Sequence, residues 1–168
     1  MKNEITVKAF FLSIFLSVIL SSAMTYLGLY AGMTISASIP AAIMSMGILR
    51  LFRESNILEN NIVQTAASAG ESLAAGVIFT LPALLLVGYW DTISYWEVTK
   101  IAMVGGILGA LFTVPLRRAL ILKAKLRFPE GVATAAVLKT GHETDKNKSQ
   151  NSLKMIGASA LIGGIVKL

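Results

Sequence analysis

The sequence has no cysteine, a single histidine and few charged residues. Without cysteine, the chain can form neither a disulfide framework nor a thiolate metal site, and His142 alone makes a Cys/His metal site untenable. Charged residues make up 14% of the 168, whereas soluble domains carry about a quarter. The composition therefore predicts a membrane protein with no metal site and no cofactor.

The longest stretch without any charge runs over residues 9–49, which is 41 residues. One helical span needs about 20 apolar residues, so this stretch predicts two spans and a tight turn. Further apolar runs predict a third and a fourth span, and the last residues look like the start of a fifth. The predicted fold is an all-α, polytopic helical membrane protein with spans at 9–27, 35–51, 72–90 and 101–116 and a partial span at 155–168.

The net charge of +6 comes from basic residues that flank the apolar segments. This pattern favours membrane topology and contact with lipid over a nucleic-acid partner. With the N-terminus inside, only Lys100 falls in an outside loop. The inside loops then hold Lys2, Lys8, Arg50, Arg53, Arg117, Arg118, Lys123, Lys125, Arg127, Lys139, Lys146, Lys148 and Lys154. The bias predicts a cytoplasmic N-terminus, and Arg50, Arg53, Glu54 and Glu59 indicate an aqueous loop after the second span.

The stretch "ENNIVQTAASAGE" ends in Glu71, directly before the third predicted span. One interpretation is an acid at headgroup level whose side chain reaches water. The other is a re-entrant segment near 56–71 that lines a polar cavity, because ionisable groups in membrane proteins usually mark a cavity or an ion route. A carboxyl group shielded from water takes up a proton more readily. The candidate lining is Asn60, Asn61, Gln64, Thr65, Ser68 and Glu71.

The stretch "FPEG" raises the same two alternatives. Pro129 suits the start of a helix, and Glu130 suits its first turn. On its own this is an ordinary helix start. The apolar residues that follow are too few to span a membrane, so a re-entrant helix near 128–140 is the alternative, with Gly131 permitting close approach.

Other small residues and prolines predict packing and helix breaks. Gly28 and Gly32 suit a tight turn or a close helix contact, and Gly70 suits dense packing beside Glu71. Pro40, inside the second predicted span, is expected to kink that helix, with Ser36 and Ser38 near the freed carbonyl. No serine-hydrolase, zinc-protease, P-loop or dinucleotide-binding signature is present, so we expect no enzyme.

Four stretches in register resemble the oligopeptide transporter (OPT) family, which includes the yellow-stripe-like transporters. They are "NEITVKAFFLSIFLS", "YLGLYAGMTISASIPAAIMSMGILR", "ILENNIVQTAASAGESLAAGVIFTLPALLL" and "VPLRRALILKAKLRFPEGVATAAVLKTG". Within them, "SASIPA", "ENNIVQTAASAGE" and "FPEG" match the family pattern, and the resemblance covers residues 3–141.

The resemblance implies part of a secondary active, proton-coupled transporter of oligopeptides or peptide-like metal chelates in the plasma membrane. Family members are several times longer, so residues 1–168 would be the N-terminal fragment of one transmembrane domain. Its partners would be the substrate, protons and the remainder of the transporter chain. Glu71 and Glu130 are the acids that could couple protons.

One position departs from the family pattern. Many members carry a second acid after the FPEG stretch, where this chain has Ala136. That difference weakens the expectation that this chain couples transport to protons or carries metal chelates. The alternative is a standalone membrane assembly module or a truncated product without transport activity.

Overall fold

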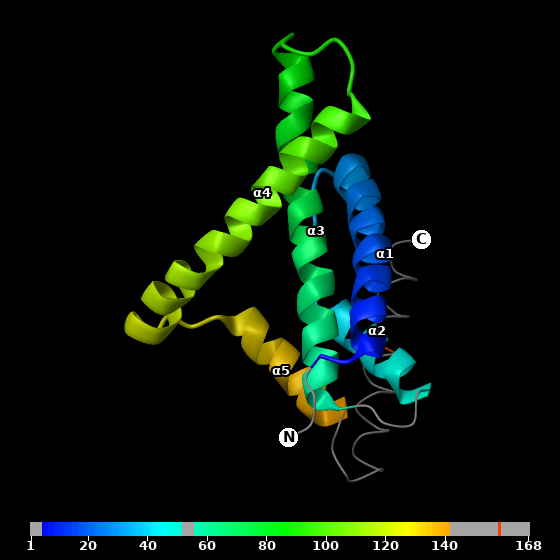
Figure 1. Cartoon of the computed structure of the whole chain (residues 1–168), viewed down its shortest axis with the longest axis vertical. Helices are drawn as coiled ribbons and strands as arrows, with labels where there is room; N and C mark the ends of the chain where they lie inside the picture. The colour runs from blue at the N-terminus through cyan, green and yellow to red at the C-terminus, as the bar shows by residue number, and fades with distance from the viewer. Residues whose placement is uncertain (1–4, 52–55, 142–157, 159–168) are drawn as a thin grey trace.

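The computed structural model describes residues 5–51, 56–141 and 158, and in these residues the secondary structure is helical, with no strand. Figure 1 shows the arrangement. The elements, in chain order, are α1 (Val7–Ala31), α2 (Ser38–Leu51), α3 (Ile57–Leu86), α4 (Tyr95–Leu116), the π-helical segment η1 (Arg117–Lys123) and α5 (Pro129–Gly141).

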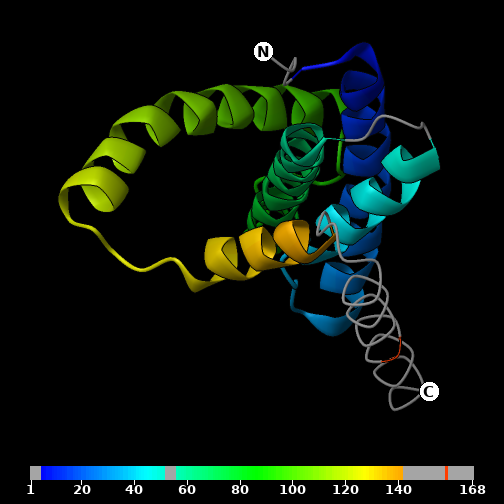
Figure 2. The same cartoon turned by 90° about the horizontal axis from the view of Figure 1, so that it is seen from below.

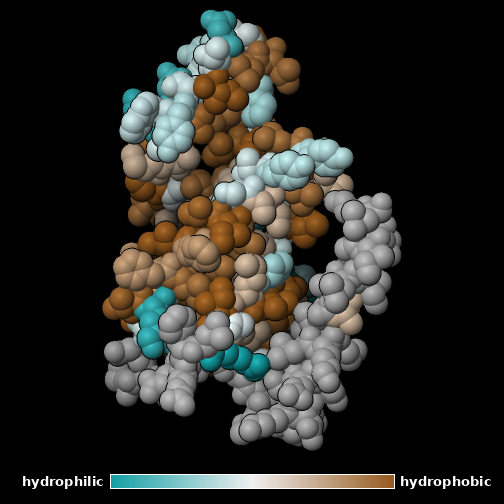
Figure 3. Space-filling model, turned by 90° about the vertical axis from the view of Figure 1, so that its right-hand side faces the viewer, coloured by the Kyte–Doolittle hydropathy of each residue, from teal (hydrophilic) through white to brown (hydrophobic). Residues whose placement is uncertain are grey.

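Three of these helices are long and apolar enough to cross a membrane. They are α1, α3 and the continuous helix Tyr95–Lys123 formed by α4 and η1. Large apolar side chains such as Phe10, Phe11 and Phe15 remain exposed on α1. Figure 3 shows a broad hydrophobic surface over the middle of the molecule. The predicted class, an all-α helical membrane protein, is confirmed.

The core lies where α1, α2 and α3 meet. Leu16 and Leu20 of α1 pack there with Val63 and Ala67 of α3 and with Ala41 of α2. These positions recur every three or four residues, so each helix presents one stripe to the others. The core is narrow because most apolar side chains face outward.

The second predicted span, residues 35–51, is helical only from Ser38 onward. The 14 residues of α2 rise about 21 Å, which is short of a hydrocarbon core of about 30 Å. Residues 33–37 before it are not helical. Pro40 explains this start, since proline lacks the N–H group and is tolerated in a first helical turn. Pro40 thus lies in the first turn of α2, and not inside a longer helix as the predicted kink assumed.

Residues 56–71 do not form a separate re-entrant segment. Instead α3 is one helix of 30 residues that joins them to the third predicted span. The N–H group of the N-cap residue Asn56 donates to Glu59 Oε2 at 3.3 Å, which helps to close the first turn. Glu59 is buried there, so its assignment to an aqueous loop is wrong. The helix contains Pro82 and ends at Leu86.

The fourth predicted span, residues 101–116, lies within α4, which begins six residues before residue 101, and the continuous apolar helix extends beyond it to Lys123. The chain continues as η1, whose π-type hydrogen bond joins Ala124 N to Ala119 O at 2.9 Å. Pro115 lies two residues before this segment and removes one α-helical donor, which favours the wider turn. The partial span predicted at 155–168 lies outside the described residues except for Ala158.

Figure 1 and Figure 2 place two short helices, α2 and α5, side by side across the end of α3 that is nearest the N-terminus. Met46 of α2 packs with Leu138 of α5. Arg50 donates through Nη2 to the carbonyl oxygen of Gly141, the last residue of α5. Both helices begin part-way along α3 and end at the same end of the bundle. The predicted short helix near 128–140 is thus present as α5.

Candidate functional site

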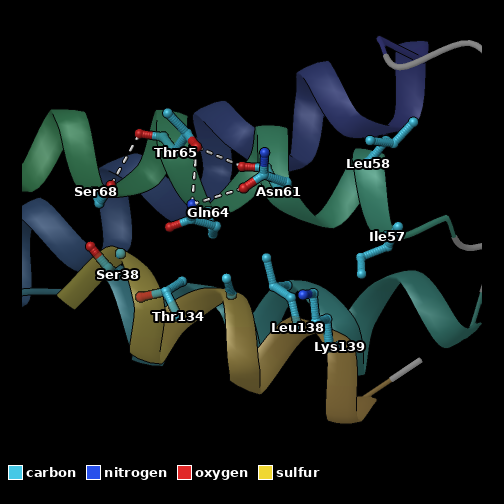
Figure 4. A pocket seen from close by; sticks show the side chains of 12 residues that line it. Ser38, Ile57, Leu58, Asn61, Gln64, Thr65, Ser68, Thr134, Leu138 and Lys139 are labelled. Carbon is cyan, nitrogen blue, oxygen red and sulfur yellow. Dashed lines mark hydrogen bonds between the residues drawn. The ribbon is translucent and has the colours of Figure 1, made fainter. Parts of the chain in front are cut away.

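A pocket of about 430 Å³ lies between α3 and α5. Figure 4 shows it from close by, with polar side chains of α3 facing α5. The end of α2 contributes through Ser38. The full lining is Ser38, Ile57, Leu58, Asn61, Gln64, Thr65, Ser68, Gly131, Thr134, Ala135, Leu138 and Lys139.

The α3 wall is a connected set of amides and hydroxyls. Gln64 Nε2 donates to Asn61 Oδ1 at 3.3 Å and to Thr65 Oγ1 at 3.0 Å. Ser68 donates through its hydroxyl to the Thr65 carbonyl at 3.1 Å. Amides carry both donors and acceptors, so this wall suits a ligand that also carries both, such as a peptide backbone.

The α5 wall is mixed. Thr134 is buried, and its hydroxyl donates to the Glu130 carbonyl at 3.0 Å. Leu138 adds apolar surface one turn further on, and Lys139 is the one basic side chain among the lining residues. A Cβ at Gly131 would come within 2.8 Å of the Phe128 ring, so the glycine permits the close approach of that ring.

Glu130 stands beside the Ser38 end of the pocket, in the first turn of α5. The Ser36 hydroxyl donates to Glu130 Oε1, and the hydroxyl oxygens of Ser36 and Ser38 lie 3.2 Å apart. Hydrogen bonds from Ser36 and then Ser38 lower the pKa of the Glu130 carboxyl below its ordinary value. Glu130 is therefore an anion at neutral pH.

Glu71 occupies a different place. It is the fifteenth of the 30 residues of α3 and is 5% exposed. It continues the buried stripe of Val63 and Ala67, which pack against α1 and α2, and it does not line the pocket. The structure thus holds an acid inside the bundle, halfway along a candidate span.

Asn60 belongs to the same buried stripe. Its side chain is fully buried, and Nδ2 donates to the Asn56 carbonyl at 3.3 Å. The predicted residues thus fall into two groups. Asn61, Gln64 and Ser68 meet in the pocket, whereas Asn60 and Glu71 face the core.

Sequence reasoning missed the contributions of Ser38, Thr134 and Lys139 to the pocket. A helical reading of "FPEG" and the residues after it could have found Thr134, because residues four apart share a helix face. Ser38 and Lys139 become relevant only once α2 and α5 are placed beside α3.

The predicted packing residues occupy particular contacts. Gly32 ends α1 with a φ of +69°, and its N–H donates to the Gly28 carbonyl at 2.9 Å. A Cβ at Gly28 would overlap the Ile78 side chain, and a Cβ at Gly70 would overlap the Ser17 hydroxyl. Pro129 is the first residue of α5, where its missing N–H is harmless.

Within the described ranges no three His, Cys, Asp or Glu side chains lie close enough together to hold a metal ion. Ala136, where many relatives are expected to carry a second acid, is exposed on α5 and lies outside the pocket lining. The chemistry that the site offers is therefore hydrogen bonding and charge.

These features define a helical membrane protein with a polar pocket at one end of its bundle. The family model described as "OPT oligopeptide transporter protein" matches residues 4–168, and the chain belongs to this family. A Haemophilus influenzae protein named "Putative oligopeptide transporter" is 47% identical over 129 residues, which cover 77% of this chain. The match spans only 20% of that relative's length. No solved structure matches.

Proposed function

We propose that the chain forms part of a proton-coupled secondary active transporter of oligopeptides, with its N-terminus in the cytoplasm of a plasma membrane. The observation that carries the proposal is the pocket between α3 and α5, whose amide and hydroxyl wall offers donors and acceptors to a peptide backbone. Peptide-like metal chelates present similar amide and carboxylate groups, so they belong to the same substrate class.

The buried carboxyl of Glu71 is the proposed proton carrier. Glu71 is 5% exposed and lies halfway along a candidate span, and ionisable groups placed inside membrane proteins usually mark an ion or proton route. Glu130 is less suited to this role, because its pKa is lowered by the serine hydroxyls. We assign Glu130 to the substrate end of the pocket instead.

The test is peptide uptake by the complete gene product reconstituted in vesicles, with an imposed pH gradient. Glu71→Gln should abolish the pH-driven accumulation and preserve exchange of peptide across the membrane, since Gln keeps the shape of the side chain and removes the acid. Glu97→Gln, an exposed acid in the first turn of α4, is the matched control and should accumulate peptide normally.

The outcomes separate the parts of the proposal. Normal accumulation by Glu71→Gln would remove the proton role of this residue. If the unaltered protein takes up no peptide at all, the transport proposal fails and the assembly-module alternative is favoured.

A further inference from the structure

The helix that runs through α4 and η1 is longer than the hydrocarbon layer of a membrane. Its 29 residues, Tyr95–Lys123, rise about 43 Å, which matches a bilayer of about 40–45 Å with both headgroup layers. The exposed Tyr95 and Trp96 suit one interface. The hydrocarbon layer is crossed in about 20 residues, and η1 begins at that distance along the helix. The segment η1 therefore lies among the lipid headgroups of the other leaflet, at the end of the molecule where α1 begins (Figure 1).

This end of the helix and the connection after it are strongly basic. Residues 117–127 contain no acid, and their exposed basic residues are Arg117, Arg118, Lys123, Lys125 and Arg127. Within the residues that the structure describes, none of these five side chains forms an ion pair or a hydrogen bond. The next acid along the chain, Glu130, is bonded to the Ser36 hydroxyl. The described part of the chain therefore offers these cations no counter-charge.

The π-helical form of η1 aligns two of the cations. The hydrogen bonds of a π-helix join residues five apart, as between Ala124 N and Ala119 O at 2.9 Å, so residues five apart stand about one turn apart. Arg118 and Lys123 have this spacing and leave the helix on about the same side. In an α-helix the residues that share a face are three or four apart, and these two side chains would diverge.

We propose that Arg118 and Lys123 bind the phosphate of an anionic phospholipid such as phosphatidylglycerol. A guanidinium group offers paired donors that fit a phosphate, and an ammonium group adds a point charge. The exposed Leu120, Ile121 and Leu122 lie between the two cations in the sequence and supply apolar contacts for the acyl chains. These apolar contacts favour a lipid over a free phosphate ion. The inference goes beyond the proposed function and does not depend on peptide transport.

Two other roles would explain the cations without a bound lipid. A basic residue near a helix C-terminus stabilises that helix, and basic residues beside a span set its orientation. Neither role distinguishes an anionic lipid from a zwitterionic one, nor Arg118 and Lys123 from the other cations of residues 117–127. Lipid preference, measured in variants that remove equal charge, therefore separates these roles from a binding site.

The experiment titrates the complete gene product in detergent with phosphatidylglycerol or phosphatidylcholine and counts bound lipids by native mass spectrometry. We expect phosphatidylglycerol to bind at least about fivefold more tightly, which corresponds to about 1 kcal/mol for one cation near anionic headgroups. Arg118→Gln/Lys123→Gln should remove this preference, whereas Arg118→Lys/Lys123→Arg should keep it. The matched control Arg117→Gln/Arg127→Gln removes the same charge from the same segment and should keep most of the preference.

The unfavourable outcomes differ from one another. A preference that survives in Arg118→Gln/Lys123→Gln overturns the inference, and a lower melting temperature of that variant would then assign the cations to an acidic segment in the remainder of the transporter chain. Equal loss in both double variants also overturns it, because charge alone would then attract the lipid. Displacement of bound phosphatidylglycerol by an equal concentration of inorganic phosphate would replace the lipid by a free anion. Peptide uptake enters none of these measurements, so the proposed function stands or falls separately.

Discussion

At the scale of single residues, Gly70 shows how closely α1 and α3 pack against each other. A Cβ at this position would overlap the hydroxyl of Ser17 and lie 3.1 Å from that of Ser21. Small residues allow such contacts between membrane helices, where close packing replaces the hydrophobic effect as the source of stability.

We expect Gly70→Val to lower the free energy of unfolding of the protein in detergent by about 1–3 kcal/mol, the usual cost of overpacking. Its melting temperature should fall accordingly. The milder Gly70→Ala should be partly rescued by Ser17→Gly, which removes the colliding hydroxyl. Gly76→Ala on the same helix meets no atom within 4 Å and is the matched control. Equal melting temperatures for Gly70→Val and the unaltered protein would show that the helices lie further apart.

Residue chemistry predicted several of these positions from the sequence because their causes are local. The left-handed backbone at position 32 favours glycine, and the first turn of a helix favours proline at position 129. Which face of α3 is buried and which lines the pocket could not be predicted in this way. Asn60 and Asn61 are adjacent and chemically identical, yet one faces the core and the other the pocket, because the neighbouring helices decide which face is buried.

At the scale of elements, the contact between the α1–α2 connection and α5 joins segments 94 positions apart in the sequence. Ser36 and Ser38 hold the Glu130 carboxylate and lower its pKa. A lowered pKa in the folded state means that the contact stabilises the protein above the unfolded-state pKa and that this contribution is lost as the pH falls through the folded-state pKa. The contact is intact at neutral pH.

The double variant Ser36→Ala/Ser38→Ala should therefore melt below the unaltered protein at pH 7. The two melting temperatures should converge once the pH is lower than the depressed pKa of Glu130. Ser22→Ala, which removes a hydroxyl bonded 2.8 Å from the Val18 carbonyl of its own helix, should show a difference that does not change with pH. A pH-independent difference for the double variant would mean that Glu130 is not held by these serines.

The same scale explains why the second predicted span was only partly correct. The lack of charge over residues 9–49 predicted that the chain crosses twice, but hydropathy says nothing of whether the backbone is helical throughout. Pro40 sets the start of α2, and residues 33–37 before it are not helical. Backbone without helical hydrogen bonds is tolerated at membrane depth where it lines a cavity, and the pocket residue Ser38 directly follows this segment as the first residue of α2.

At the scale of the whole molecule, α1 and α3 run in the same direction and α4 runs back (Figure 1). The chain between α1 and α3 must therefore return across the bundle, and α2 together with residues 33–37 is the segment that does so. The α3–α4 connection lies at the end opposite the N-terminus. It carries the exposed Tyr89, and the first turn of α4 carries the exposed Tyr95 and Trp96. Such side chains suit a membrane–water interface.

This arrangement can be tested by labelling, since the chain has no cysteine of its own. Val7→Cys at the start of α1 and Thr92→Cys between α3 and α4 are exposed positions at opposite ends of the bundle. In intact cells, with any cysteine elsewhere in the complete gene product replaced, a membrane-impermeant maleimide should label Thr92→Cys alone. Val7→Cys should react only after permeabilisation.

Labelling of Val7→Cys alone in intact cells would invert the orientation and place the Lys139 end of the pocket outside, so the peptide would meet it on entry. Labelling of both positions in intact cells would contradict a membrane crossing between residues 7 and 92.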